Sequence, residues 1–225
     1  MSMPQTSRRS VVDELARRLS EGVRDSRFMP GQRLVEAELT RELGVSRGSL
    51  REAFRRLASD GLIEITPHKG AMVRRLTFTE AIELFQVRIE LEALAARLAA
   101  SVMADHLARA AFLAAIEPIR RQVPRLSADA YIEENRAFHD AILAGSGNAQ
   151  LIGISRRFQL PLILSQVRAA ISLEAMAASV AEHRGIAEAI LSGNEEKATG
   201  AVRQHLTRAM ALLEAVPKSC FAEIR

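Results

Sequence analysis

Alternation of apolar and polar residues occurs in one short stretch of this chain, Leu-Ile-Glu-Ile-Thr at residues 62–66, and this limits any β-sheet to a small one near the N-terminus. A turn at residues 67–70 leads to a second short apolar run at 71–74, a spacing that predicts a β-hairpin. Beyond Leu76 there is no further strand pattern, and apolar residues recur at helical spacing. The chain is therefore predicted to be mainly α-helical with one small hairpin.

Three helices are predicted before the hairpin. Apolar residues about one turn apart place them at residues 10–26, 36–43 and 46–60. Pro30-Gly31 ends the first helix, and Gly44-Val45 turns the chain between the second and the third. The resulting order is helix, helix, turn, helix, hairpin.

A second, all-helical domain is predicted after a boundary near residue 76. Thr77 and Glu80 have the spacing of a capping box, which opens a long helix to about residue 104. Later helical stretches, separated by proline or glycine, lie at about 106–121, 127–144, 148–159, 161–171, 177–191 and 195–215. We therefore expect two domains, residues 1–76 and residues 77–225, the second an all-helical bundle.

Composition narrows the class of protein. Hydrophobic residues make up 48% of the chain and charged residues 26%, the balance of a folded globular protein. The single cysteine excludes a disulfide framework and a cysteine-rich zinc module, and no apolar run approaches the ~18 residues of a membrane span. Because the first residues also lack the apolar core of a signal peptide, we expect a cytoplasmic protein with no membrane partner.

The third predicted helix carries the residues expected to contact DNA. Ser46, Arg47 and Ser49 crowd its first turn, Gly48 allows close backbone approach, and Arg51 follows one turn after Arg47. Hydroxyls and a helix N-terminus suit phosphate, and an arginine can bind both acceptors of guanine. A capped surface helix with solvated arginines is the simpler alternative.

The hairpin tip and the charge distribution favour DNA binding. The tip, His68-Lys69-Gly70, is short, basic and ends in glycine, which suits a wing laid against a groove or a phosphate backbone. Residues 1–76 hold 15 Lys/Arg against 10 Asp/Glu, whereas residues 77–225 hold 16 against 17. A basic head on a neutral body fits a nucleic-acid-binding protein, although chance can produce the same asymmetry.

Three of the five histidines fall on the apolar stripes of predicted helices in the second domain. His139 shares an inward face with Asn135, one turn earlier, and His183 and His205 lie on two later helices. Imidazole binds divalent ions such as Zn, Ni, Cu or Fe, so the four residues predict a metal site of unknown metal identity. A ligand-free core of hydrogen-bonded histidines is the alternative.

The N-terminal motifs also resemble a known family. The segments PGQRL and ELTRELGVSRGSLREAFRRLASDGLIEITPHKGAMV are similar to the winged helix-turn-helix of GntR-type bacterial transcription regulators. The resemblance implies contacts to base or phosphate by Ser46, Arg47, Gly48, Ser49 and Arg51, with His68, Lys69 and Gly70 as the wing.

The helical region resembles the FCD effector domain of the FadR subfamily of these regulators, through NRAFHDAI, EHRGIAEAI and VRQHLTRAM. The resemblance implies that Asn135, His139, His183 and His205 bind a metal, with Asn135 where aspartate is commoner. It also implies that Arg88 helps to hold the effector, although an intrahelical pair with Glu92 is an equally good interpretation of Arg88.

These observations predict a DNA-binding transcription repressor that acts as a homodimer on palindromic operator DNA, not an enzyme. Four neutral ligands leave a divalent ion with its full charge and open positions, so a small carboxylate is the expected effector. One alternative is a dimeric DNA binder with a purely structural helical core. A metallohydrolase is the other, but its candidate bases Glu134 and Glu182 each adjoin a proposed ligand and so point roughly 100° away around the helix.

Overall fold

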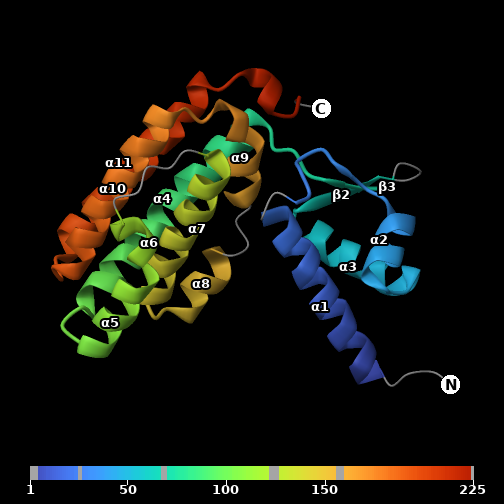
Figure 1. Cartoon of the computed structure of the whole chain (residues 1–225), viewed down its shortest axis with the longest axis horizontal. Coiled ribbons are helices and arrows are strands. Elements are labelled where there is room, and N and C mark those ends of the chain that lie inside the picture. Colours follow the sequence, from blue (N-terminus) through green and yellow to red (C-terminus); the bar gives the residue numbers. More distant parts are fainter. Residues whose placement is uncertain (1–4, 25–26, 67–69, 122–126, 156–159, 224–225) are drawn as a thin grey trace. The chain divides into compact units, whose positions relative to one another are not determined.

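The computed structural model describes residues 5–24, 27–66, 70–121, 127–155 and 160–223. Its contacts divide the chain into two compact units, Met1–Leu76 with Gln159–Gln166, and Thr77–Phe158 with Val167–Arg225 (Figure 1). The predicted fold class, mainly helical with a winged helix-turn-helix and a helical bundle, is confirmed. Of the helices in the described ranges, none combines the length and the hydropathy of a membrane span.

The N-terminal unit is a three-helix head with a small sheet. Its elements are α1 (Gln5–Arg24), β1 (Arg33–Leu34), α2 (Glu36–Leu43), α3 (Arg47–Ser59), β2 (Ile63–Thr66) and β3 (Gly70–Val73). The three strands are antiparallel in the order β1-β3-β2, with Ile63 opposite Val73 and Arg33 opposite Met72. β1 was not predicted because two residues are too few to show an alternating pattern.

Local sequence signals explain the ends of α2 and α3. Gly44 ends α2 in the left-handed region at φ 64°, a conformation that glycine adopts without steric cost. Ser46 then caps α3, because its hydroxyl accepts a hydrogen bond from the backbone N–H of Ser49. α1 packs against α3, and the residues buried on the two helices include Leu19, Leu50 and Phe54.

The second unit is built from longer helices. They are α4 (Phe78–Ser101), α5 (His106–Ala115), α6 (Glu117–Arg120), α7 (Ala128–Gly145), α8 (Ala149–Ser155), α10 (Leu173–Leu191) and α11 (Glu195–Leu212), with short 3₁₀ turns at Arg168–Ala170, Leu213–Ala215 and Lys218–Cys220. α9 (Leu160–Val167) belongs to the head unit as far as Gln166, whereas the sequence pattern placed these residues with the helical domain.

Several expected helices differ from the structure. The first begins at Gln5 rather than residue 10, and the stretch 161–171 ends as an α-helix at Val167, before a 3₁₀ turn. The stretch 106–121 divides into α5 and α6, because Pro118 lacks the N–H that a continuous helix needs and lies in the first turn of α6. α10 begins at Leu173 rather than near residue 177, because the Ser172 side chain caps it by accepting from the N–H of Ala175. The capping box at Thr77 and Glu80 is present as predicted.

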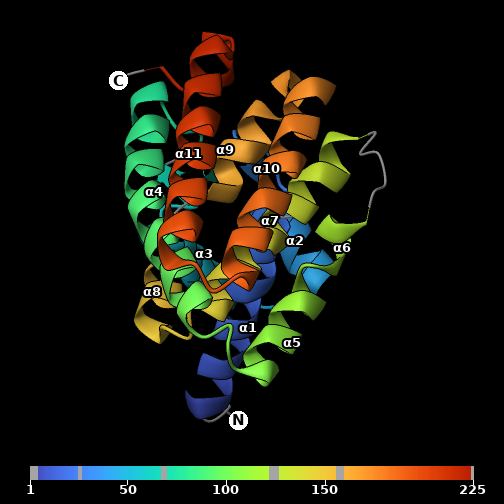
Figure 2. The same ribbon diagram turned by 90° about the vertical axis from the view of Figure 1, so that its left-hand side faces the viewer.

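The core of the helical unit is mainly apolar but also contains a group of buried polar side chains. α4 packs along α11 and α7, and α10 packs against α11, so that these four helices lie side by side (Figure 2). Phe138, Ile142, Ile186 and Leu206 are among the fully or nearly fully buried side chains. Polar side chains are nevertheless buried among them: Arg88, Glu92, Asn135, His139, Ser179, His183 and His205.

Candidate functional site

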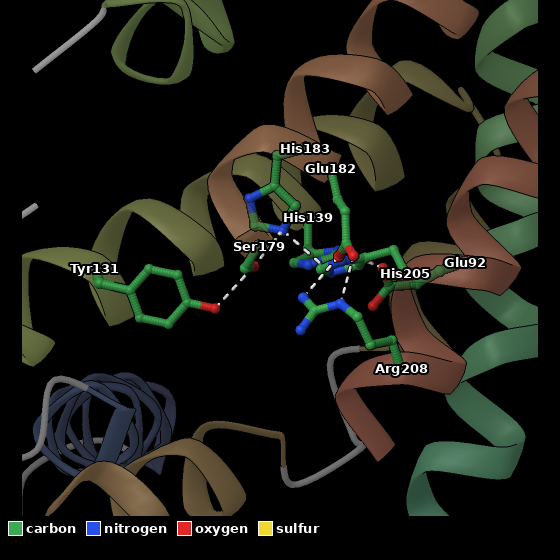
Figure 3. A network of polar contacts seen from close by, with 8 residues as sticks. All are labelled: Glu92, Tyr131, His139, Ser179, Glu182, His183, His205 and Arg208. Carbon is green, nitrogen blue, oxygen red and sulfur yellow. Dashed lines mark hydrogen bonds and ion pairs between the residues drawn. The ribbon is translucent and has the colours of Figure 1, made fainter. Parts of the chain in front are cut away.

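The three histidines predicted to lie inward meet inside the helical unit. His139 comes from α7, His183 from α10 and His205 from α11, and their side chains are turned toward one another (Figure 3). One ring nitrogen from each can be chosen so that all lie within 4.8 Å of one another, and the residues are 4%, 0% and 3% exposed. The packing of three helices therefore brings the imidazoles into one cluster.

Carboxylates fix the tautomers of two of these rings. His139 Nδ1 lies 2.5 Å from Glu92 Oε2, and His205 Nδ1 lies 2.7 Å from Glu182 Oε2. Because an ionised carboxylate can only accept, the Nδ1 atom of each histidine must be the donor. The Nε2 atoms of neutral His139 and His205 therefore carry lone pairs.

His183 completes the cluster. Its Nε2 lies 3.1 Å from His205 Nε2, which is a bare acceptor, so without an ion His183 Nε2 carries the proton and donates it. His183 Nδ1 is then a lone pair, and it is buried without a partner, as is His139 Nε2. Two ring nitrogens of the cluster are thus buried acceptors with no donor among the described residues.

The protonation states of the cluster follow from its burial. Burial lowers the pKa of His139 and of His183, and it lowers the pKa of His205 to about 4, so all three rings are neutral at pH 7. Burial alone raises the pKa of Glu92, but the charge of Arg88 and the contacts with His139 outweigh it and hold that pKa well below its usual range. The net effect on the pKa of Glu182 is also downward, because hydrogen bonds from Arg208 and His205 outweigh burial.

The donor set fits a divalent metal ion. Neutral imidazoles are common ligands of such ions, and a carboxylate on the opposite ring nitrogen is the usual outer partner of a metal-bound histidine. Two nitrogens about 2.0–2.1 Å from one ion and adjacent in its coordination lie roughly 3 Å apart, close to the 3.1 Å between His183 and His205. An ion bound by these two Nε2 atoms requires the His183 proton to lie on Nδ1.

Asn135 and Arg88 border this cluster. Asn135 is 5% exposed and precedes His139 by one turn of α7, so it lies on the same inward face. Arg88 is 5% exposed and forms the intrahelical ion pair with Glu92 that the sequence allowed as an alternative. Its Nη2 is nevertheless buried without a hydrogen-bond partner among the described residues, and could still donate to an anion.

Several polar partners of the cluster were not found from the sequence. Glu182 was expected to point away from the site, because it adjoins His183 in sequence. Its carboxylate instead crosses to His205 on α11 and also pairs with Arg208 (Figure 3). The Tyr131 hydroxyl donates to Ser179 Oγ at 2.9 Å, and Ser179 Oγ lies 3.5 Å from His183 Nε2. Both Glu182 oxygens are engaged, so it is not a free general base.

The predicted DNA-contacting residues lie at the start of α3, with unequal exposure. Ser46, Arg47 and Gly48 are exposed, and Arg47 has no hydrogen-bond or ion-pair partner within the described ranges. Ser49 is only 8% exposed, and its hydroxyl and N–H both contact Ser46 Oγ. Arg51 is exposed but pairs with Glu36 of α2 at 3.0 Å, a contact that exchange for a phosphate would break.

The wing is described only at its base. His68 and Lys69 lie outside the described residues, while Gly70 begins β3 at φ 84°. A side chain at Gly70 would come within 3.9 Å of the guanidinium of Arg33, which is exposed on the neighbouring strand β1. Arg33 thus adds a basic group beside the wing that sequence reasoning missed, since its strand was not predicted.

Comparisons with known proteins find matches over both units. Residues 11–73 match the family described as bacterial regulatory proteins, gntR family, and residues 83–208 match the FCD domain. The chain is 30% identical over 204 residues to a probable D-xylose utilization operon transcriptional repressor of Paenarthrobacter nicotinovorans, covering 89% of this chain and 87% of that protein. It is 28% identical to the HTH-type transcriptional repressor GlaR of Escherichia coli, covering 83% and 88%.

Solved structures share the fold. Escherichia coli McbR/YncC superimposes with a TM-score of 0.78 at 20% identity, covering 91% of this chain and 97% of that chain. A GntR regulator from Rhodococcus sp. RHA1 gives a TM-score of 0.72 at 23% identity, covering 92% and 98%. At these identities the likeness concerns the fold alone.

Proposed function

Because the chain belongs to the GntR family of bacterial regulatory proteins and carries an FCD domain, we propose that it is a repressor whose operator affinity is controlled by a small carboxylic acid bound in the helical unit. Membership of the family makes the protein a DNA-binding transcription regulator and not an enzyme. Repression is proposed because two similar proteins that align over most of their length bear that name.

The head, residues 1–76, supplies the DNA-binding surface in this proposal. The N-terminal turn of α3 enters the major groove, where Arg47 reads base edges and Ser46 and Gly48 approach the phosphate backbone. Arg51 exchanges its ion pair with Glu36 for one with a phosphate. Ser49 hydrogen-bonds to the N-cap residue Ser46 and so stabilises the start of the helix. His68, Lys69 and Gly70 form the wing, with Arg33 beside its base.

The helical unit, residues 77–225, receives the signal. The observation that supports this most directly is the buried cluster of His139, His183 and His205, in which the lone pair of His139 Nε2 has no donor among the described residues. An unpartnered buried polar atom is costly, and a bound ion would accept this lone pair. With Asn135 these residues would hold a divalent ion such as Zn or Ni, whose chemistry when bound is electrostatic attraction for a carboxylate.

Arg88 is the proposed second contact for that carboxylate, through its unpartnered Nη2. An acid held by groups from α4 and α7 favours one packing of these helices over another, and binding can control DNA affinity only through such a preference. We further propose that the protein acts in the cytoplasm as a homodimer on a palindromic operator, because paired heads multiply affinity and specificity.

The test begins with an operator selected from random duplexes by the purified full-length protein. Fluorescence anisotropy then measures operator affinity with Zn²⁺ or Ni²⁺, with a chelator, and with a panel of small carboxylic acids. We expect a bound metal, and an acid that weakens operator binding by about 5- to 150-fold, the usual range of allosteric coupling. His139→Ala should abolish both metal binding and the acid response. His106→Ala, at an exposed histidine on α5, is the matched control and should change neither.

Either of two outcomes contradicts the proposal. A protein that carries no metal and ignores added Zn²⁺ and Ni²⁺ would support the purely structural core instead. Equal acid affinity in the presence and absence of operator would exclude coupling, because binding free energies are linked reciprocally.

A further inference from the structure

The charged groups around the histidine cluster cancel one another. Arg88 and Glu92 are the buried charged side chains of the helical unit within the described ranges, apart from the histidines, and they are paired. The other carboxylate that contacts the cluster, Glu182, pairs with Arg208. Each carboxylate that orients a histidine is thus already neutralised by an arginine. These side chains therefore offer no net negative charge to offset the positive charge of a bound ion.

The ligands themselves add no charge. An imidazole that binds an ion through a nitrogen lone pair is neutral, and the fourth proposed ligand, Asn135, is an amide. A divalent ion at this position therefore keeps a charge of +2 in an environment that is nearly closed to water. Buried charge without a counter-charge is strongly unfavourable, so the site needs an anion.

The charge needed to neutralise the ion determines the kind of anion. With a monocarboxylate bound, the net charge of ion and anion is +1, whereas with a dianion bound it is zero. A second observation agrees, since Arg88 Nη2 is a buried donor without an acceptor on the side of the cluster formed by α4. One carboxylate can meet the ion while another accepts from Arg88.

We infer that the acid recognised by this site is a small dianion, such as a dicarboxylate, and that the neutral amide of Asn135 sets the preference for two negative charges over one. This inference rests on the metal and acid site of the proposed function. It assigns Asn135 a specificity role that aspartate, of nearly the same shape, would abolish. A carboxylate there would reduce the charge left for the effector from +2 to +1.

The experiment compares acids that differ by one charge and almost nothing else. Full-length protein loaded with Zn²⁺ is titrated calorimetrically with malonate, succinate and glutarate, and with the monoamide of each. We expect the best diacid to bind at least tenfold more tightly than its own monoamide, with no proton release when buffers of different ionisation enthalpy are compared. In Asn135→Asp the advantage of the diacid should fall at least tenfold, while Zn²⁺ still binds.

Asn194→Asp is the matched control. It makes the same substitution at the exposed N-cap of α11, where aspartate also caps, and should leave the preference unchanged. Helical circular dichroism and Zn²⁺ stoichiometry show whether each variant is folded and loaded.

The outcomes separate this inference from the proposed function. A protein that takes up no metal overturns both. With Zn²⁺ bound, diacids and monoamides of equal affinity overturn only the inference, and so does a lack of binding by all six probes. A monoamide that binds as tightly as its diacid while releasing about one proton would show that a deprotonated water supplies the second charge, which also overturns it.

Discussion

Removal of Arg88 should destabilise the helical unit strongly, although Arg88 is also the proposed effector contact. In Arg88→Met the carboxylate of Glu92, which is 4% exposed, loses its ion-pair partner. Its remaining hydrogen-bond donor among the described residues is the His139 N–H. Breaking a buried pair in this way costs about 3–5 kcal/mol, a large part of the roughly 5–15 kcal/mol that stabilises a typical domain. At roughly 2–4 °C per kcal/mol for a chain of this size, the melting temperature should fall by about 6–20 °C.

A double-mutant cycle distinguishes the pair from ordinary packing. Glu92→Gln alone leaves Arg88 buried without its counter-ion, whereas Arg88→Met with Glu92→Gln removes both charges and keeps an acceptor for His139. The double variant should therefore be more stable than either single variant, with a coupling of about 2 kcal/mol or more. Because the Glu92 carboxylate in Arg88→Met can lose its charge only by binding a proton, the defect of that variant should shrink toward acid pH.

Urea unfolding of the full chain in a chelator, followed by circular dichroism, measures these differences without a contribution from metal binding. The melt has to be resolved into transitions if the two units unfold separately. Losses in the two single variants that simply add in the double variant would refute the reasoning, since they would show that the charges of Arg88 and Glu92 do not interact.

Three further predictions concern other parts of the molecule. Arg47→Ala should lower operator affinity by about 1–3 kcal/mol and relax specificity in gel shifts, whereas Arg97→Ala, an exposed arginine on α4, should leave both unchanged. His205 has its pKa lowered to about 4 by burial and by nearby charges, so the unfolded chain binds its proton first as the pH falls. The free energy of unfolding of the metal-free protein should therefore not depend on His205 above about pH 6.5 and should fall by about 3 kcal/mol between pH 6.5 and 4 in urea titrations. A His205→Gln variant should show a shallower slope over the same range. Gln166→Ala should cost about 1–3 kcal/mol, because the Leu76 N–H and C=O bond the Gln166 amide at 2.9 and 2.8 Å; an unchanged urea midpoint would contradict this.

Most of the fold could be predicted because its signals are local. The buried stripe of α1, the Ser46 cap and the Thr77 capping box each involve residues within a few positions of one another. Errors arose where a few residues decide the structure. A two-residue strand shows no period, and the break between α5 and α6 depends on a single proline, Pro118.

The histidines could be predicted to lie inward, but their partners could not. Helical periodicity places His139, His183 and His205 on the buried faces of their own helices, which is information that one helix contains. Glu92 reaches His139 only because α4 packs against α7, and Glu182 reaches His205 only because α10 packs against α11. Such register between helices does not appear in the periodicity of either helix.

The same dependence on packing makes the cluster a property of the folded bundle. His183 and His205 are 22 positions apart in the chain, and Glu92 and His139 are 47 apart, so the unfolded chain does not hold these groups together. A ligand that engages all three imidazoles binds the native state and not the unfolded one, and its binding free energy adds to the stability of the bundle. Because the outer carboxylates Glu92 and Glu182 come from α4 and α10, that stabilisation depends on the packing of four helices. If the cluster binds a ligand as proposed, a change in the packing of α4, the first helix after the head, would alter the affinity for that ligand, and by linkage the ligand would alter the packing of α4.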